Sequence, residues 1–191
     1  MPEQIKLVAT GWHHSLKSYL ESEQAKIDRP GFVIDRNGTI HGGTSSSGAR
    51  REDECVEGLG WVIALVNVGP VVLYAGRWYP AAPDHETGRF GRIAGADPVR
   101  VPYEYCTCKP YHGCTHYEMM GDRQLQALRS LLKSLLSQFH LQFPYDNQLG
   151  EICPRALAGK SGIYFASSYD KRRSDIHPQI ELLHLIKSLA Q

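Results

Sequence analysis

The fold of this chain is decided by the stretch Gly60-Trp-Val-Ile-Ala-Leu-Val-Asn-Val-Gly69. Its residues are apolar at odd and at even positions alike, which is the pattern of a β-strand covered on both faces. A strand of this kind belongs in the middle of a sheet that carries helices on each side. We therefore predict a central buried strand over residues 60–69.

Further short strands are predicted on both sides of this stretch. Asn37-Gly38 between the apolar runs 32–35 and 39–41 is a strong hairpin signal. The β-branched and apolar runs at residues 5–10 and 162–166 have the length of buried strands. Residues 70–74 and 77–79 are expected to add short strands to the centre of the same sheet.

Helical periodicity indicates three helices. Residues 15–26 are expected to form one, ended by Pro30-Gly31. A second begins at Asp122 and places a leucine stripe on one face as far as Phe139. A third follows Pro178, and we expect these residues of it to point inward: Ile180, Leu183, Ile186 and Leu189.

The order of these elements predicts an α/β fold with a central mixed sheet flanked by helices. We expect a single domain over residues 1–191, with a Cys/His-rich insertion at about 80–121, because that segment is too long for an ordinary connection. Residues 44–57 are expected to form a surface loop and residues 152–160 to be irregular.

Charge and hydropathy limit the partners. Lys+Arg number 21 against 20 for Asp+Glu, so no overall charge attracts nucleic acid, and we expect none to bind. No stretch has the ~20 apolar residues of a membrane span, and the start of the chain does not read as a secretory signal. Synthesis in the cytoplasm is expected, with release by lysis or by a dedicated secretion machine.

Four stretches, in this order, carry a family resemblance: Trp12-His-His-Ser15, the hairpin 32–40, Val62-Ile-Ala-Leu-Val-Asn67-Val-Gly-Pro70, and Ala166 to Pro178. Together they resemble the zinc-dependent N-acetylmuramoyl-L-alanine amidases that share their fold with peptidoglycan recognition proteins. Each stretch is weak alone, but four in the correct order are specific. The resemblance implies an amidase-like fold, a peptidoglycan or muropeptide substrate, and action on the cell wall or periplasm.

The resemblance also implies site residues. His13 and Asp175 correspond to the first and third zinc ligands, Arg173 to the cation that steadies the oxyanion, and Asn67 to a substrate-binding position. The second ligand position, expected to be His, falls on Ala166. Zinc with three protein ligands lowers the pKa of bound water toward ~7, and the resulting hydroxide attacks the amide.

The alanine at position 166 leaves three explanations open. It is a deliberate substitution of a ligand, a natural loss in a pseudoenzyme, or a position replaced by another ligand such as His14 or His177. Ala64 is a second departure, since many relatives have a glutamate there as general base. The chain is thus expected to be an amidase whose activity Ala166 impairs, acting as a phage lysin, an antibacterial effector or a wall-recycling enzyme. The alternative is a non-catalytic pseudoenzyme that binds muropeptides.

The insertion contains a separate group of soft ligands. Cys106, Cys108, Cys114 and His116 lie within eleven positions, enough for a structural zinc ion. A disulfide between two of the cysteines is the alternative. Five cysteines, an odd number, do not form a disulfide framework in a chain of this length, so a reduced or metal-bound state is expected.

Overall fold

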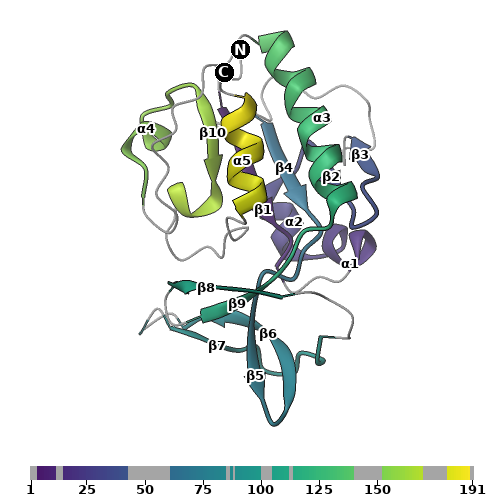
Figure 1. The fold of residues 1–191 in the computed structure, drawn as a ribbon, viewed down its shortest axis with the longest axis vertical. Helices are drawn as coiled ribbons and strands as arrows, with labels where there is room; N and C mark the ends of the chain where they lie inside the picture. Colours follow the sequence, from purple (N-terminus) through teal and green to yellow (C-terminus); the bar gives the residue numbers. More distant parts are fainter. Residues whose placement is uncertain are drawn as a thin grey trace.

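The computed structural model of the protein describes residues 4–11, 15–42, 61–84, 87, 89–99, 105–111, 114–139, 152–169 and 180–189. Within these residues the chain forms two five-stranded sheets, one of which is flanked by helices (Figure 1). The fold is therefore mixed α/β, as the sequence predicts. No helix among the described residues has the length and apolar character needed to cross a membrane.

The first sheet contains the strand that the sequence places at its centre. Its strands, in spatial order, are β10 (Gly162–Phe165), β1 (Gln4–Ala9), β4 (Trp61–Leu65), β2 (Phe32–Ile34) and β3 (Ile40–Gly42). The first four run parallel and β3 runs antiparallel to β2. The mixed sheet and the Asn37-Gly38 hairpin are thus confirmed.

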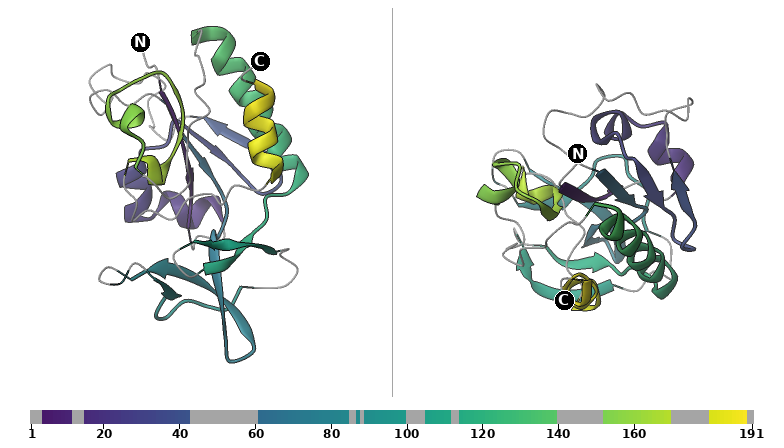
Figure 2. Two further views of the ribbon diagram at one scale, coloured as in Figure 1. Left: turned by 60° about the vertical axis from the view of Figure 1, so that its left-hand side comes forward. Right: turned by 90° about the horizontal axis from the view of Figure 1, so that it is seen from above.

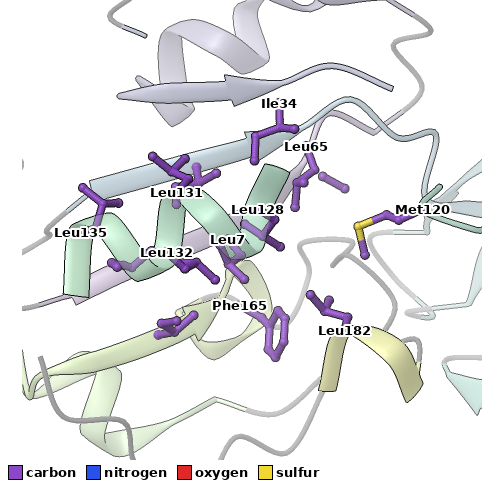
Figure 3. Packing of buried hydrophobic residues seen from close by; sticks show 14 residues of the cluster. Leu7, Ile34, Leu65, Met120, Leu128, Leu131, Leu132, Leu135, Phe165 and Leu182 are labelled. Atoms are coloured by element: carbon purple, nitrogen blue, oxygen red, sulfur yellow. The ribbon is translucent and has the colours of Figure 1, made fainter. Parts of the chain in front are cut away.

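Helices cover both faces of this sheet (Figure 2). The helices α3 (Asp122–Phe139) and α5 (Ile180–Leu189) lie on one face, where a large apolar cluster joins them to the strands (Figure 3). The short helices α1 (Leu16–Leu20) and α2 (Glu23–Asp28) pack on the other face in a second cluster. Along β4, Ile63 belongs to the first cluster and Ala64 to the second, which explains why the stretch is apolar on both parities.

The predicted apolar face of α3 is confirmed, and the apolar face of α5 includes more residues than predicted. In α3, Leu128, Leu131, Leu132 and Leu135 are buried. In α5, Ile186 and Leu189 contact the same cluster, and so do Leu182 and Leu185, which the sequence analysis did not select. The side chains of Ile180 and Leu183 lie outside the described residues.

The prediction of one continuous helix over residues 15–26 is wrong. Two short helices replace it, and Ser22 separates them. The Ser22 hydroxyl donates to the Tyr19 carbonyl at 2.6 Å and accepts from the Ala25 N–H at 3.2 Å. One serine side chain therefore ends α1 and caps α2, because a short hydroxyl side chain competes with the helical bonds of the backbone. The segment 152–160, expected to be irregular, holds the short helix α4 (Pro154–Leu157), with proline in its first turn.

The second sheet is antiparallel. Its strands, in spatial order, are β7 (Phe90–Arg92), β6 (Arg77–Pro83), β5 (Pro70–Tyr74), β9 (Cys114–Glu118) and β8 (Tyr105–Tyr111). The prediction that residues 70–74 and 77–79 belong to the central sheet is therefore wrong. The chain turns at Asn67 and at Gly69, which has a φ of +76°, so β5 leaves the first sheet and pairs with β6 and β9.

The expected insertion at about 80–121 stays a prediction. The described strands of the second sheet already begin at Pro70 and end at Glu118. The segment 44–57, expected to be a surface loop, lies outside the described residues.

Candidate functional site at the carboxyl edge of the parallel strands

The carboxyl ends of the parallel strands meet at one edge of the first sheet. Leu7 pairs with Phe165 across β1 and β10, and Ala9 pairs with Leu65 across β1 and β4. Ala166 directly follows β10, Thr10 directly follows β1, and Asn67 lies two residues after the end of β4. In open parallel sheets this edge is the usual place for a binding site.

Ala166 lies at this edge and is almost fully buried, with 1% of its surface exposed. It begins a 3₁₀ turn over Ala166–Ser168, in which its carbonyl accepts from the Tyr169 N–H at 3.1 Å. Its methyl group packs in the apolar cluster on the side of α1 and α2, together with Val8 and Ala64.

The two departures from the amidase pattern thus share one cluster. Ala64 and Ala166 come from β4 and from the end of β10, strands that both neighbour β1. Tyr19 of α1 is fully buried in the same cluster. The positions that would supply a zinc ligand and a general base are therefore both occupied by methyl groups in an apolar environment.

The other residues of the predicted site lie outside the described part of the chain. These are His13, Arg173 and Asp175, together with the proposed substitute ligands His14 and His177. The described neighbours of the first histidine are Gly11, with a φ of +66°, and Ser15, whose hydroxyl caps α1 by accepting from the Ser18 N–H at 3.2 Å. The roles assigned to these residues remain predictions.

Asn67 is buried, and its side chain makes hydrogen bonds within the protein. Its Oδ1 accepts from the Gly69 N–H at 2.7 Å, and its Nδ2 donates to the Glu118 carbonyl at 3.3 Å. The Asn67 backbone also exchanges hydrogen bonds with the Thr10 hydroxyl. These bonds hold the turn between β4 and β5, a structural role; contact of Asn67 with a substrate stays a prediction.

Glu118, which the sequence analysis did not select, is the central charge of this region. Its Oε2 accepts from the Arg36 Nη2 at 2.9 Å and from the Val68 N–H. Burial raises the pKa of this carboxyl above its usual range, although Arg36 and the Val68 N–H act in the opposite direction. The position at the end of β9 has no motif around it, so only the fold brings Glu118 to Arg36, 82 residues away in the sequence.

Gln124 closes the same edge from the side of α3. Its Nε2 donates to the carbonyls of Ile34 and Val66, at 3.1 Å each. Ile34 is the last residue of β2 and Val66 directly follows β4, so one buried amide from the first turn of α3 donates to the ends of both segments. The Ile34 carbonyl also accepts from the Val66 N–H at 2.9 Å.

Two residues of the predicted structural metal site, Cys114 and His116, have other contacts in the structure. The Cys114 Sγ lies 3.4 Å from the carbonyls of Val71 and His116. The His116 ring contacts the Trp78 ring in a tilted arrangement, with 4.6 Å between ring centroids and an interplanar angle of 42°, and its Nδ1 lies 2.9 Å from the Thr115 hydroxyl. The side chains of Cys106 and Cys108 lie outside the described residues. Among the residues that are described, no three His, Cys, Asp or Glu side chains converge as a metal site would require.

Comparison of the chain with protein-family models, with curated proteins and with solved structures gave no match. The family resemblance therefore rests on the four sequence stretches alone.

Proposed function

We propose that this protein is a peptidoglycan-directed domain of the amidase type. Its reaction is hydrolysis of the amide between N-acetylmuramic acid and the L-alanine of the stem peptide, and Ala166 impairs that reaction. One observation carries the proposal. Two of the four stretches that resemble the amidases, 32–40 and 62–70, contain β2 and most of β4, and the other two follow β1 and β10 in the sequence; these four strands are adjacent in one sheet.

The described donor set does not fit a catalytic zinc ion. Of the three expected ligand positions, Ala166 is the one that the structure describes, and a methyl group cannot bind a metal. When bound, zinc would act as a Lewis acid and supply hydroxide as the nucleophile. His13 and Asp175 would hold it with only two protein ligands, and two ligands bind zinc weakly.

Restoring the missing ligand tests this proposal. We expect Ala166→His to raise the zinc content toward one ion per chain and to produce lysis of purified sacculi, measured by metal analysis and by turbidity. A second substitution, His13→Ala, should abolish both gains. Ala158→His serves as the control, because Ala158 is exposed and follows α4, outside the strands of the sheet.

A buried position tolerates a larger side chain poorly. Ala166→Cys therefore accompanies the histidine variant, since a thiolate is a zinc ligand of smaller volume. The proposal is wrong if at least one of the two variants folds and the folded variants gain neither zinc nor lytic activity.

A non-catalytic peptidoglycan-binding module is the second candidate function. The observation that favours it is that Ala64 and Ala166 are both buried in one apolar cluster, with 0% and 1% of their surfaces exposed. A chain that sediments with sacculi but gives no lysis after Ala166→His would support this candidate over the enzyme.

A further inference from the structure

The second sheet carries an aromatic and basic surface at its β5–β6 hairpin. In Figure 1 this hairpin extends away from the first sheet, at the bottom of the view. The hairpin turns at Ala75 and Gly76, whose φ angles are +48° and +74°. Tyr74, directly before the turn, is 56% exposed although it is a large aromatic side chain.

Strand pairing places two tyrosines and two arginines on one face of the second sheet. Tyr74 is opposite Arg77, Val72 is opposite Tyr79, and Ala81 is opposite Arg92. Opposite residues of an antiparallel ladder share a face, and so do alternate residues along one strand. One surface, here called the Tyr-Arg surface, is therefore lined by Tyr74, Arg77, Tyr79 and Arg92.

The aromatic rings hold one arginine in place. The rings of Tyr74 and Tyr79 meet edge to face, with 6.2 Å between centroids and an interplanar angle of 78°. The Arg92 guanidinium lies 4.6 Å from the Tyr74 centroid and 5.0 Å from the Tyr79 centroid. These cation–π contacts orient the guanidinium without neutralising its charge.

The positive charge of this surface has no acidic partner in the described part of the chain. The salt bridges found there join Lys26 to Glu23 and Arg36 to Glu118, so neither Arg77 nor Arg92 takes part. An exposed site with aromatic faces and oriented guanidinium groups is complementary to a ligand that has flat apolar surfaces and anionic groups.

We propose that the Tyr-Arg surface binds an anionic glycan, in which sugar rings stack on the tyrosines and carboxylates pair with Arg92 and Arg77. The choice of the peptidoglycan strand as this glycan rests on the proposed function. The surface lies on β5, β6 and β7, whereas the Ala166 cluster lies on the first sheet. It therefore anchors the protein on the polymer separately from the site of hydrolysis.

Sedimentation of the full chain with purified sacculi tests this proposal. Tyr74→Ala and Arg92→Gln should each weaken binding about fivefold to tenfold, which is the size expected for losing one aromatic or cation–π contact. Tyr74→Phe should bind like the unchanged chain, because it keeps the ring. Arg92→Gln should also reduce the dependence of binding on salt.

The matched control is Arg129→Gln, because Arg129 is an exposed arginine on α3, outside the second sheet. It should leave binding unchanged. Thermal unfolding of each variant shows whether the fold is kept, and exposed side chains such as Tyr74 contribute little to stability.

Three outcomes would overturn the proposal. They are absence of sacculus binding by the unchanged chain, binding that is insensitive to both substitutions, and tighter binding to neutral chitin oligosaccharides or single-stranded DNA than to soluble glycan strands. Failure of Ala166→His to restore zinc and lysis would contradict the proposed hydrolysis while leaving this surface intact. Restored lysis with binding insensitive to Tyr74→Ala would contradict this surface alone.

Discussion

At the scale of single residues, Glu118 joins three parts of the chain that are far apart in sequence. Its carboxylate accepts from Arg36 in the β2–β3 turn and from the Val68 N–H after β4, while its own backbone ends β9. Only 3% of its side chain is exposed, so the carboxylate has lost most of its hydration. Burial outweighs the attraction of Arg36, and the pKa of Glu118 is raised.

This raised pKa predicts how stability depends on pH. As the pH rises from 4.5, the ordinary pKa of a glutamate, the unfolded chain loses the Glu118 proton while the folded chain keeps it. The folded state therefore binds more protons, and its stability falls as the pH rises toward the folded pKa. Glu118→Gln removes this titration, so the wild type should lose stability relative to the variant across that window.

Urea unfolding of both proteins at a series of pH values measures this difference. Well below pH 4.5 the difference should be constant, because the carboxyl is then protonated in both states. A wild type that gains stability over the variant as the pH rises would show that the Arg36 pair outweighs burial.

At the scale of elements, the β2–β3 turn and helix α3 pack so closely that the turn requires glycine. Gly38 has a φ of +85°, and a Cβ at this position would lie 2.6 Å from the carbonyl oxygen of Arg123 in the first turn of α3. Gly76, in the β5–β6 turn, has a similar φ of +74° but nothing within 4 Å of its Cβ position. Comparing the same substitution at the two glycines therefore separates the energetic cost of backbone strain from the cost of the steric clash.

We expect Gly76→Ala to cost about 1–2 kcal/mol, the strain of a left-handed non-glycine residue. Gly38→Ala should cost roughly 1–3 kcal/mol more, because the new methyl group collides with backbone atoms. Denaturant unfolding of the two variants compares the losses. Equal losses would mean that α3 moves away from the turn at little cost.

At the scale of the whole molecule, the two sheets differ in how much apolar contact supports them. Among the residues that the structure describes, fourteen buried ones form the cluster under α3 and α5, whereas the cluster of the second sheet contains Val68, Val71 and Val99, with Trp78 packed against it. Regions with few buried apolar contacts open at lower free energy than the global unfolding.

Native-state hydrogen exchange should therefore show earlier opening in β5 and β6 than in β1 and β4. Asn67→Ala removes the bonds from Asn67 to Gly69 and Glu118, so it should lower the opening free energy of the second sheet by about 1–3 kcal/mol. The exposed Ser137→Ala on α3 is the control. A uniform shift in all strands would show instead that the two sheets unfold as one unit.

The sequence by itself determined the elements that depend on local patterns. The apolar residues at both odd and even positions of 60–69 predict β4, Asn37-Gly38 predicts the hairpin, and the leucine spacing predicts α3. Periodicity and turn chemistry act over a few residues, so they can be read without the fold. The split of the first helix at Ser22 was missed, because the competition between a hydroxyl and the helical backbone depends on local geometry that periodicity does not report.

Only the tertiary structure decided which strands share a sheet and which buried polar groups meet. Residues 70–74 and 77–79 read as strands, but their assignment to a second sheet follows from the turn at Asn67 and from pairing with β9. Likewise, Ala64 and Ala166 are separate departures in the sequence and join one apolar cluster only because β4 and β10 lie on either side of β1. The reason is physical: strand pairing and the burial of charge are contacts between distant residues, and they are selected by the free energy of the whole fold.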